Sequence, residues 1–184
     1  MKVVFLDRDG VINVDSPDYI KSWDEFDFIP GSLEAIALLT AHGLTVIVIT
    51  NQSVIGRKLV EPETLQDMHQ RVQDAVLAAG GRIHAFYHCP HVPQDACVCR
   101  KPEPGLILAA QRDFGLDLSQ TCMVGDSEKD MVAAQKAGCG GRVLVRTGNG
   151  LKTESQLLQS GTSVDHVAEN LLEAAKFIIS FKGR

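Results

Sequence analysis

The chain has no apolar stretch long enough to cross a bilayer, and its N-terminus enters a predicted strand without the regions of a signal peptide. It also lacks an excess of positive charge: the formal net charge is −5, which argues against nucleic acid and membrane surfaces as partners. Internal repeats, low-complexity tracts and linkers are missing as well. We therefore expect residues 1–184 to form one cytoplasmic domain, and the lack of an extended apolar seam on any predicted helix favours a monomer.

The bulk composition is that of an ordinary globular protein, with 45% apolar and 22% charged residues. The length of 184 residues is enough to bury a substantial core. Five cysteines are present. In a cytoplasmic protein they favour metal binding or thiol chemistry over a framework of disulfides.

Short apolar runs alternate with amphipathic stretches along most of the chain. The expected strands are Val3–Leu6, Leu44–Ile49, Ala85–His88, Cys122–Val124 and Arg142–Val145. The expected helices are Leu33–Ala41, Pro62–Ala79, Leu106–Asp113, Lys129–Ala137 and a last one over about Glu169 to Phe181. This alternation predicts an α/β fold, a Rossmann-like open parallel sheet with helices on both faces. No large insertion follows the first or third strand, so no cap domain is expected, and Cys89–Pro104 stands out as a loop rich in Cys and Pro.

Two carboxylates follow the first predicted strand directly, in Asp7-Arg8-Asp9-Gly10. Residues two apart on an extended segment point the same way, so Asp7 and Asp9 would face one spot. Crowded carboxylates repel and need a cation or a shared proton. A divalent metal would meet that need, leaving one carboxylate free to act as a nucleophile and the other to move protons. A solvated acidic turn is the alternative for this segment taken alone.

Polar groups also end two later strands. Thr50–Ser53 closes the second strand and could hold a phosphate oxygen, although a capping turn would have the same composition. Asp126 follows the fourth strand, and in an open parallel sheet these strand ends meet at one edge, where ligands bind. Oxygen ligands from Asp7, Asp9 and Asp126 suit Mg²⁺.

The residues near these motifs could supply further charges. Lys101, from Arg100-Lys101-Pro102, would neutralise a phosphate and the nucleophile beside it, unless the basic pair is only solvated. Asp130 could orient Lys101 or a metal-bound water, or simply favour the start of a helix.

Four ligand-type side chains fall within eleven positions of the Cys89–Pro104 loop: Cys89, His91, Cys97 and Cys99. Three thiolates and one imidazole form a common closed tetrahedral zinc site, which would be structural because no coordination position is left open. Scattered buried cysteines beside a surface histidine are the alternative. Since Arg100 and Lys101 follow directly, zinc here would fix where the phosphate-binding cation points.

Four segments, taken in order, resemble the four signature motifs of the haloacid dehalogenase superfamily of phosphotransferases: DRDG, ITNQS, RKP and GDSEKD. The resemblance implies that Asp7 attacks phosphorus to form an aspartyl-phosphate. Asp9 would protonate the leaving alcohol and then activate water. Thr50 and Lys101 would bind the transferring phosphoryl group. Mg²⁺ would be held by Asp7, Asp126 and the backbone carbonyl of Asp9.

The zinc loop, with DRDGVIN and VRTG, narrows the resemblance to the heptose bisphosphate phosphatases and the related histidinol-phosphate phosphatases. The heptose branch resembles the chain more closely in Asn13-Val14-Asp15, Tyr19, Phe28-x-Pro30-Gly31 and Val145-Arg146-Thr147-Gly148. That branch implies removal of the 7-phosphate from a D-glycero-D-manno-heptose 1,7-bisphosphate, a step toward lipopolysaccharide or S-layer sugars. Histidinol phosphate stays open as the substrate, because the short cysteine loop also fits that branch. A zinc-stabilised regulatory module would predict damage to Asp7 or Asp9, and both are intact.

The resemblance also implies which residues contact the small phosphorylated sugar. The expected substrate-binding residues are Arg8, Asp15, Asp18, Tyr19, Asn51, Gln52, Ser53 and Arg100. Ser127 stands where relatives commonly have a basic residue, which leaves Lys129 as a candidate for that contact. Arg57-Lys58 could serve a second phosphate or form a solvated pair.

Overall fold

The computed structural model describes residues 1–160 and 163–180, and a six-stranded sheet in the order β3-β2-β1-β4-β5-β6 runs through it. The strands are β1 (Val3–Leu6), β2 (Thr45–Asn51), β3 (Ala85–Cys89), β4 (Thr121–Gly125), β5 (Gly141–Val145) and β6 (His166–Ala168). Every neighbouring pair is parallel. The predicted open parallel sheet is therefore confirmed.

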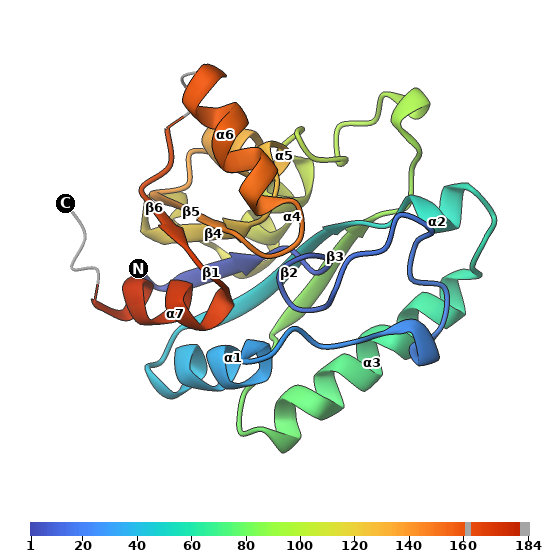
Figure 1. Cartoon of the computed structure of the whole chain (residues 1–184), viewed down its shortest axis with the longest axis horizontal. Coiled ribbons are helices and arrows are strands. Elements are labelled where there is room, and N and C mark those ends of the chain that lie inside the picture. Colours follow the sequence, from blue (N-terminus) through green and yellow to red (C-terminus); the bar gives the residue numbers. More distant parts are fainter. Residues whose placement is uncertain (161–162, 181–184) are drawn as a thin grey trace.

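Helices cover both faces of this sheet. They are α1 (Ser32–Ala41), α2 (Ser53–Gly56), α3 (Pro62–Ala78), α4 (Gly105–Phe114), α5 (Glu128–Ala137), α6 (Gly150–Ser160) and α7 (Leu171–Ser180). Three short 3₁₀ helices are η1 (Trp23–Glu25), η2 (Pro93–Asp95) and η3 (Leu118–Gln120). Figure 1 shows α1, α3 and α7 below the sheet and α4, α5 and α6 above it.

The alternation of side chains along β1 explains why both faces must be covered. Val4 and Leu6 belong to the core shared with α1, α3 and α7, whereas Val3 and Phe5 belong to the core shared with α4 and α5. All four are at most 5% exposed. Complete burial of a side chain of this size contributes about 1.5–3 kcal/mol, so a strand with two apolar faces is stable only between two layers.

The chain order places the two neighbours of β1 on opposite sides of it. Leu6 at the end of β1 lies beside Val48 of β2 and Val124 of β4. The strand order reverses at β1, and such a switch point leaves a crevice at the carboxyl ends of the strands. The segments after β1, β2 and β4 therefore meet there.

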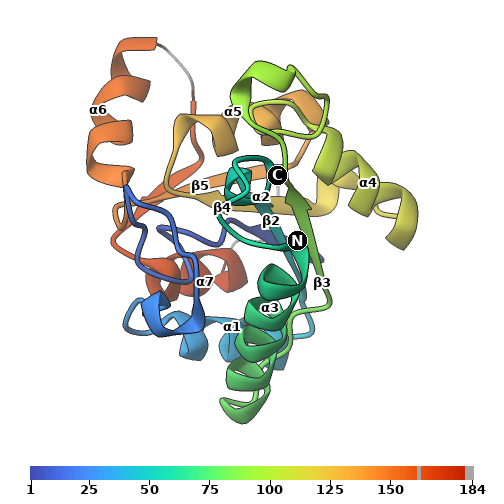
Figure 2. The same ribbon diagram turned by 90° about the vertical axis from the view of Figure 1, so that its right-hand side faces the viewer.

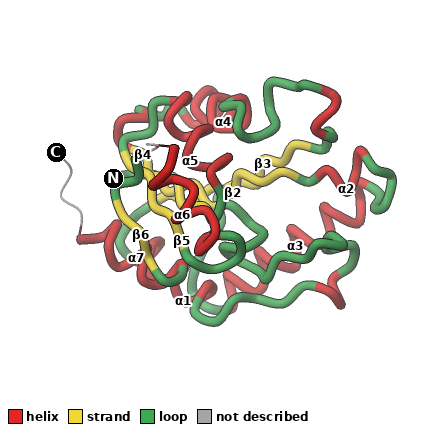
Figure 3. The backbone as a smooth tube through the Cα atoms, turned by 45° about the horizontal axis from the view of Figure 1, so that its top comes forward, coloured by secondary structure: helices red, strands yellow, loops and turns green. Residues whose placement is uncertain are grey.

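Two long connections without strands border this edge, one between β1 and α1 and the other between β3 and α4 (Figure 3). The second contains the cysteine-rich loop, which Figures 1 and 2 both show beyond the end of β3 and next to α2. The N–H of Gly56 in α2 donates to the carbonyl of Pro90, at 2.9 Å, which fixes this contact. The segment from β1 to α1 contains η1 as its regular element and is too short for a cap domain.

The predicted elements match those observed, with two exceptions in the second half and one early helix. The sequence analysis missed α2, α6 and β6. β6 has only three residues, of which two are half-buried, so it lacks a clear apolar pattern. The last predicted helix corresponds to α7, and its predicted end at Phe181 lies outside the described residues. Within the described part of the chain, no helix combines the length and apolar character needed to span a membrane.

Candidate active site

Asp7 follows β1 and lies against Lys101. Its backbone N–H continues the sheet by donating to the carbonyl of Val124 at 3.0 Å, so the position of Asp7 is set by β4. Its Oδ2 lies 2.8 Å from the Lys101 Nζ, and its Oδ1 accepts the Arg8 N–H at 2.7 Å. The side chain retains 13% exposure, so it can be reached from the cavity.

Lys101 is buried to 2% exposure and its ammonium group has three acceptors. They are Asp7 Oδ2, Asp130 Oδ1 at 2.6 Å and the carbonyl of Ile49 at 2.8 Å. An ammonium group has three N–H donors, so this set satisfies it completely. Asn51 fixes the backbone as well, accepting the Lys101 N–H at 3.0 Å and donating to its carbonyl at 3.1 Å. Asp130 therefore orients Lys101, one of the three roles that the sequence left open.

Asp9 lies in a separate network on the other side of the same turn. Its Oδ1 accepts from Arg8 at 2.7 Å and from Asn13 at 2.9 Å, and its Oδ2 accepts from Gln52 at 2.7 Å. The Gln52 amide also donates to the Thr50 hydroxyl at 2.9 Å. Arg8 is 1% exposed and has its guanidinium over the Phe26 ring, so this cation is directed at Asp9 rather than at solvent.

Asp126 follows β4 and is enclosed by two glycines. A Cβ atom on Gly10 or Gly148 would lie 2.2 Å from the Asp126 Oδ2, so only glycine permits these close approaches. Both glycines also have positive φ angles, +80° and +58°. The same Oδ2 accepts the backbone N–H of Asn149 at 2.8 Å and its Nδ2 at 3.2 Å.

A cavity of about 250 Å³ joins these groups. It is lined by Asp7, Arg8, Asp9, Asp15, Ser16, Tyr19, Ile20, Thr50, Asn51, Gln52, Ser53, Arg100, Asp126, Ser127, Lys129 and Asn149. All but two of the predicted catalytic, substrate-binding and magnesium residues are in that set. Of the two others, Lys101 reaches the cavity through Asp7, whereas Asp18 is exposed and does not line it.

Arg57 also approaches this rim, with its guanidinium 5.5 Å from the centre of the Tyr19 ring. Tyr19 itself has a φ of 64°, a conformation that is uncommon for a residue with a side chain. The cation therefore packs against the loop that was predicted to contact the sugar.

The carboxyl groups of Asp7, Asp9 and Asp126 differ in electrostatic setting. Burial raises the pKa of Asp7 well above its ordinary value, with Lys101 opposing and Asp130 and Asp126 adding to the rise. Burial, together with the Asp130 charge, raises the pKa of Asp126 to about 6. At Asp9 burial also acts to raise the pKa, but the Arg8 charge and the hydrogen bonds outweigh it and leave the pKa below normal. The buried carboxyl groups of Asp7 and Asp126 thus need a further positive charge nearby if both are to be ionised.

A divalent cation fits that need. Oxygens of Asp7, Asp126 and Asp130 lie within 4.8 Å of one another. Those of Asp130 are already used, because Oδ1 pairs with Lys101 and Oδ2 accepts from the N–H and hydroxyl of Ser127. Asp7 and Asp126 remain as candidate ligands, and carboxylate oxygens suit Mg²⁺.

The cysteine loop forms a second cluster of potential ligands. The ligand atoms of Cys89, His91, Cys97 and Cys99 all lie within 4.8 Å of one another. The three sulfur–sulfur distances are 3.3, 3.4 and 3.6 Å, and the His91 Nδ1 lies 3.3 and 3.6 Å from two sulfurs. A tetrahedron with Zn–S bonds of about 2.3 Å has sulfurs about 3.8 Å apart, so the sulfurs here lie slightly closer together than in such a site. The donor set fits zinc.

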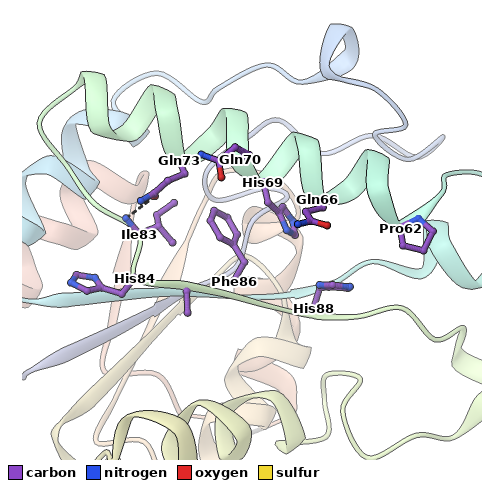
Figure 4. A pocket seen from close by; sticks show the side chains of 10 residues that line it. Pro62, Gln66, His69, Gln70, Gln73, Ile83, His84, Phe86 and His88 are labelled. Carbon is purple, nitrogen blue, oxygen red and sulfur yellow. Dashed lines mark hydrogen bonds between the residues drawn. The ribbon is translucent and has the colours of Figure 1, made fainter.

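Another cavity, of about 450 Å³, lies between α3 and β3 (Figure 4). Its lining includes three histidines, His69, His84 and His88, and none of the motif residues. His69 stacks on Phe86 with ring centres 4.6 Å apart, and its buried Nε2 has no hydrogen-bond partner among the described residues. Burial lowers the pKa of His69 to about 3, so its ring is neutral in the folded protein.

Two residues that donate to the carboxylates of the site were absent from the predicted set. Asn13 donates to Asp9, and Asn149 donates to Asp126. Both stand in or beside segments that carried the family resemblance, DRDGVIN and VRTG. That proximity was a signal for them, but a contact between residues 126 and 149 depends on how β4 and β5 are arranged and cannot be read from spacing.

Comparison with known proteins identifies the family of this chain. A model of the HAD-hydrolase-like family matches residues 98–174. The D-glycero-beta-D-manno-heptose-1,7-bisphosphate 7-phosphatase of Bordetella bronchiseptica is 46% identical over 180 residues, which cover 95% of this chain and 100% of that protein. The protein of the same name from Pseudomonas aeruginosa is 46% identical over 162 residues, with 88% and 90% coverage. A crystal structure of the B. bronchiseptica D,D-heptose 1,7-bisphosphate phosphatase complexed with magnesium and phosphate has a TM-score of 0.91 and 44% identity, covering 97% of this chain and 98% of its own.

Proposed function

Because the chain belongs to the D-glycero-beta-D-manno-heptose-1,7-bisphosphate 7-phosphatase family of HAD-like hydrolases, we propose that it removes the 7-phosphate from D-glycero-D-manno-heptose 1,7-bisphosphate with Mg²⁺. The relatives are named for the beta anomer, and the same preference is proposed here. The observation that carries the proposal is the Asp7–Lys101 pair beside a cavity that Asp9 and Asp126 also line. The reaction is hydrolysis of a phosphoric monoester.

In the first half of the reaction, a carboxylate oxygen of Asp7 forms a bond to phosphorus while the bond from phosphorus to the sugar oxygen breaks. Asp9 donates a proton to that leaving oxygen. The phosphate dianion arriving beside Asp9 opposes the Arg8 charge and raises the pKa of Asp9, which favours the protonated acid at this step. Thr50 and Lys101 stabilise charge around the transferring group, as phosphoryl transfer requires.

In the second half, Asp9 accepts a proton from a water molecule, whose oxygen attacks phosphorus. The bond between phosphorus and Asp7 breaks, so that Asp7 returns as a carboxylate and inorganic phosphate leaves. Bound Mg²⁺, held by Asp7, Asp126 and the backbone carbonyl of Asp9, would neutralise charge on the phosphoryl oxygens. Lys101 opposes the effect of burial on the Asp7 carboxyl, and Asp130 and the Ile49 carbonyl hold its ammonium group in position for this.

The sugar and its second phosphate would bind along the rim of the cavity. Asp15 and Tyr19 belong to the loop after β1 and would contact hydroxyls, whereas Arg100 and Lys129 bring positive charge to the lining of the same cavity. Asn51, Gln52, Ser53 and Arg8 complete the proposed set, Arg8 acting through Asp9. Asp18 also belongs to the proposed set. It is exposed outside the cavity, so it would contact the substrate only after a movement of its loop.

The four-residue Cys/His cluster is proposed to hold a structural zinc ion. Cys89 ends β3, and Cys99 lies two residues before Lys101, so a metal at this position would tie the sheet to the phosphate-binding lysine. Four protein ligands leave no open coordination position, which excludes a catalytic role for such a metal.

The remaining proposals concern the setting of the enzyme. We propose one hydrolase domain over residues 1–184, acting as a cytoplasmic monomer in the synthesis of lipopolysaccharide precursors. The single continuous sheet supports one domain, since all six of its strands pair in series.

Phosphate release with Mg²⁺ tests the function, using the alpha and beta anomers of heptose 1,7-bisphosphate and histidinol phosphate side by side. Phosphorus NMR identifies the phosphate that is lost. We expect the beta anomer to be the best substrate and its 7-phosphate signal to disappear while the 1-phosphate signal stays. A preference for histidinol phosphate, or loss of the 1-phosphate, would overturn the proposed substrate.

A further inference from the structure

The segment that leads into α6 lies directly against the Asp126 carboxylate. Thr147 donates its hydroxyl proton to the carbonyl of Gly10 at 2.7 Å, which ties this segment to the turn after β1. Gly10 and Gly148 both approach the Asp126 Oδ2 closely enough to exclude a Cβ atom. Residues far apart in the sequence thus form one enclosure around a single carboxylate oxygen.

Asn149 contributes two hydrogen bonds to this enclosure. Its backbone N–H and its Nδ2 both donate to the Oδ2 of Asp126, at 2.8 and 3.2 Å. The same Nδ2 lies 3.4 Å from the Oδ2 of Asp15, at the start of the loop proposed to contact the sugar. The side-chain amide of Asn149 therefore bridges the carboxylate at the end of β4 and the loop after β1.

The position of Asn149 in the chain suggests that its side chain caps helix α6, but in the structure this side chain bonds to Asp126 and Asp15 instead. Asn149 precedes the first residue of α6, where an asparagine side chain commonly accepts an N–H from the first turn of the helix. Here the carbonyl of Asn149 accepts the Thr153 N–H at 2.9 Å, while its side chain donates away from the helix to Asp126 and Asp15.

We propose that Asn149 is a positioning residue for the cation, which fixes the orientation of Asp126 and couples it to Asp15. The inference rests on the proposed function in one respect, since it takes Asp126 to be a ligand of Mg²⁺. The backbone N–H and the side-chain Nδ2 of Asn149 both hold the Asp126 Oδ2, so the carboxylate keeps one rotation and presents its other oxygen in a fixed direction. Outer hydrogen-bond partners of metal ligands typically change metal affinity by about 10–100-fold.

The test measures cation binding without substrate, by titrating the full-length protein with Mg²⁺ or Mn²⁺ in a calorimeter. Asn149→Ala removes the side-chain bonds but keeps the backbone N–H, and Asn149 is exposed, so the substitution leaves no cavity in the core. We expect a dissociation constant for Mg²⁺ raised about tenfold, with an unchanged melting temperature. Gln156→Ala removes an exposed amide from the adjoining helix α6 and serves as the matched control, with affinity expected to stay at the wild-type value.

Two further variants separate the possible failures. Asp126→Asn should abolish cation binding, and if it does not, the proposed metal site itself is wrong. If Asp126→Asn abolishes binding but Asn149→Ala binds Mg²⁺ like the wild type, the positioning role of Asn149 is overturned. Asp15→Ala tests the coupling between Asp15 and Asp126. Its effect on cation affinity is measured once in the wild type and once in the Asn149→Ala variant. A smaller effect in the Asn149→Ala variant supports the coupling, and equal effects contradict it.

Discussion

The two clusters of potential metal ligands are built in opposite ways. Asp7 and Asp126 stand at the ends of β1 and β4, strands that are fully buried along almost all their length. The Cys/His cluster begins at the end of β3 but continues in a loop, where His91 is exposed and Val98, between two of the cysteines, is 79% exposed. The sheet thus holds the acidic site in place before any cation binds, whereas the loop has little packing of its own.

This difference assigns different tasks to the two clusters. In the acidic site, buried carboxyl groups repel one another, which lowers the stability of the fold. The same groups are proposed to bind the cation and to attack phosphorus. The loop would instead gain order from the proposed zinc ion, since metal binding to such a site supplies folding free energy. Lys101 connects the two: its side chain pairs with Asp7 and Asp130, and its backbone follows the cysteines.

Asp7→Asn should give the largest effect on activity and almost none on stability. We expect loss of phosphate release on the order of 10⁴-fold or more, because the nucleophile is removed. Lys101 keeps Asp130 as its partner and one repelling charge disappears, so the free energy of unfolding should change by no more than about 1 kcal/mol. Steady-state phosphate release and urea unfolding measure the two quantities, and retained activity would refute Asp7 as the nucleophile.

Asp9→Asn should reduce both activity and stability. General acid–base catalysis contributes about 10²–10⁴-fold, which sets the expected loss of turnover. Arg8, at 1% exposure, would also lose its charged partner, and we expect unfolding to become easier by about 1–3 kcal/mol. The same two assays serve here, and a variant as stable as Asp7→Asn would show that the Arg8–Asp9 pair contributes nothing to folding.

Cys97→Ser tests whether the second cluster needs its metal. Zinc should be lost on elemental analysis, amide hydrogen exchange should increase over residues 89–104, and activity should fall by about 10²-fold through displacement of Lys101. Cys139→Ser is the matched control, because Cys139 lies outside the cluster. Wild-type protein without zinc, purified in the absence of chelator, would count against the site.

His69 offers the smallest effect and lies away from both clusters. Its folded pKa of about 3 is below the ordinary 6.5, so the unfolded chain takes up the proton first as pH falls. The stability it contributes is complete above pH 6.5 and is lost as pH falls toward 3, by about 2 kcal/mol at pH 5.

The His69→Phe variant keeps a ring against Phe86 and removes the titration. Its free energy of unfolding should fall less between pH 7 and pH 5 than that of the wild type, whereas His42→Gln, at an exposed position, should behave like the wild type. Equal pH dependence in all three proteins would contradict a neutral, buried His69.

Sequence patterns predicted those parts of the molecule in which the local sequence alone determines the structure. The apolar runs located β1 to β5, because a strand buried on both faces is apolar along its length. The motifs located four residues of the cavity region through the local sequence as well: Asp7, Asp9 and Asp126 follow strands, and Lys101 follows the cysteine-rich loop. The short β6 and the helix α6 carry no comparable pattern and depend on packing against β5 and α5.

The contacts within the site were beyond sequence reasoning. The burial of Arg8, its direction toward Asp9, and the enclosure of Asp126 by Gly10 and Gly148 depend on how distant segments approach one another. Asp18 is the opposite case: the resemblance predicted a contact, and the loop leaves this residue exposed outside the cavity. Chemical type and spacing locate most of the residues that line the cavity, but not the neighbours that hold them in place.

Trapping of the covalent intermediate tests the central claim most directly. Wild-type protein mixed with heptose 1,7-bisphosphate and Mg²⁺ is quenched during turnover and reduced with borohydride, which converts an aspartyl-phosphate to homoserine. Mass spectrometry of the N-terminal peptide should find this conversion at Asp7 alone, and only when substrate is present. Conversion at Asp9 or Asp126, or none at Asp7 under conditions of rapid phosphate release, would contradict the account.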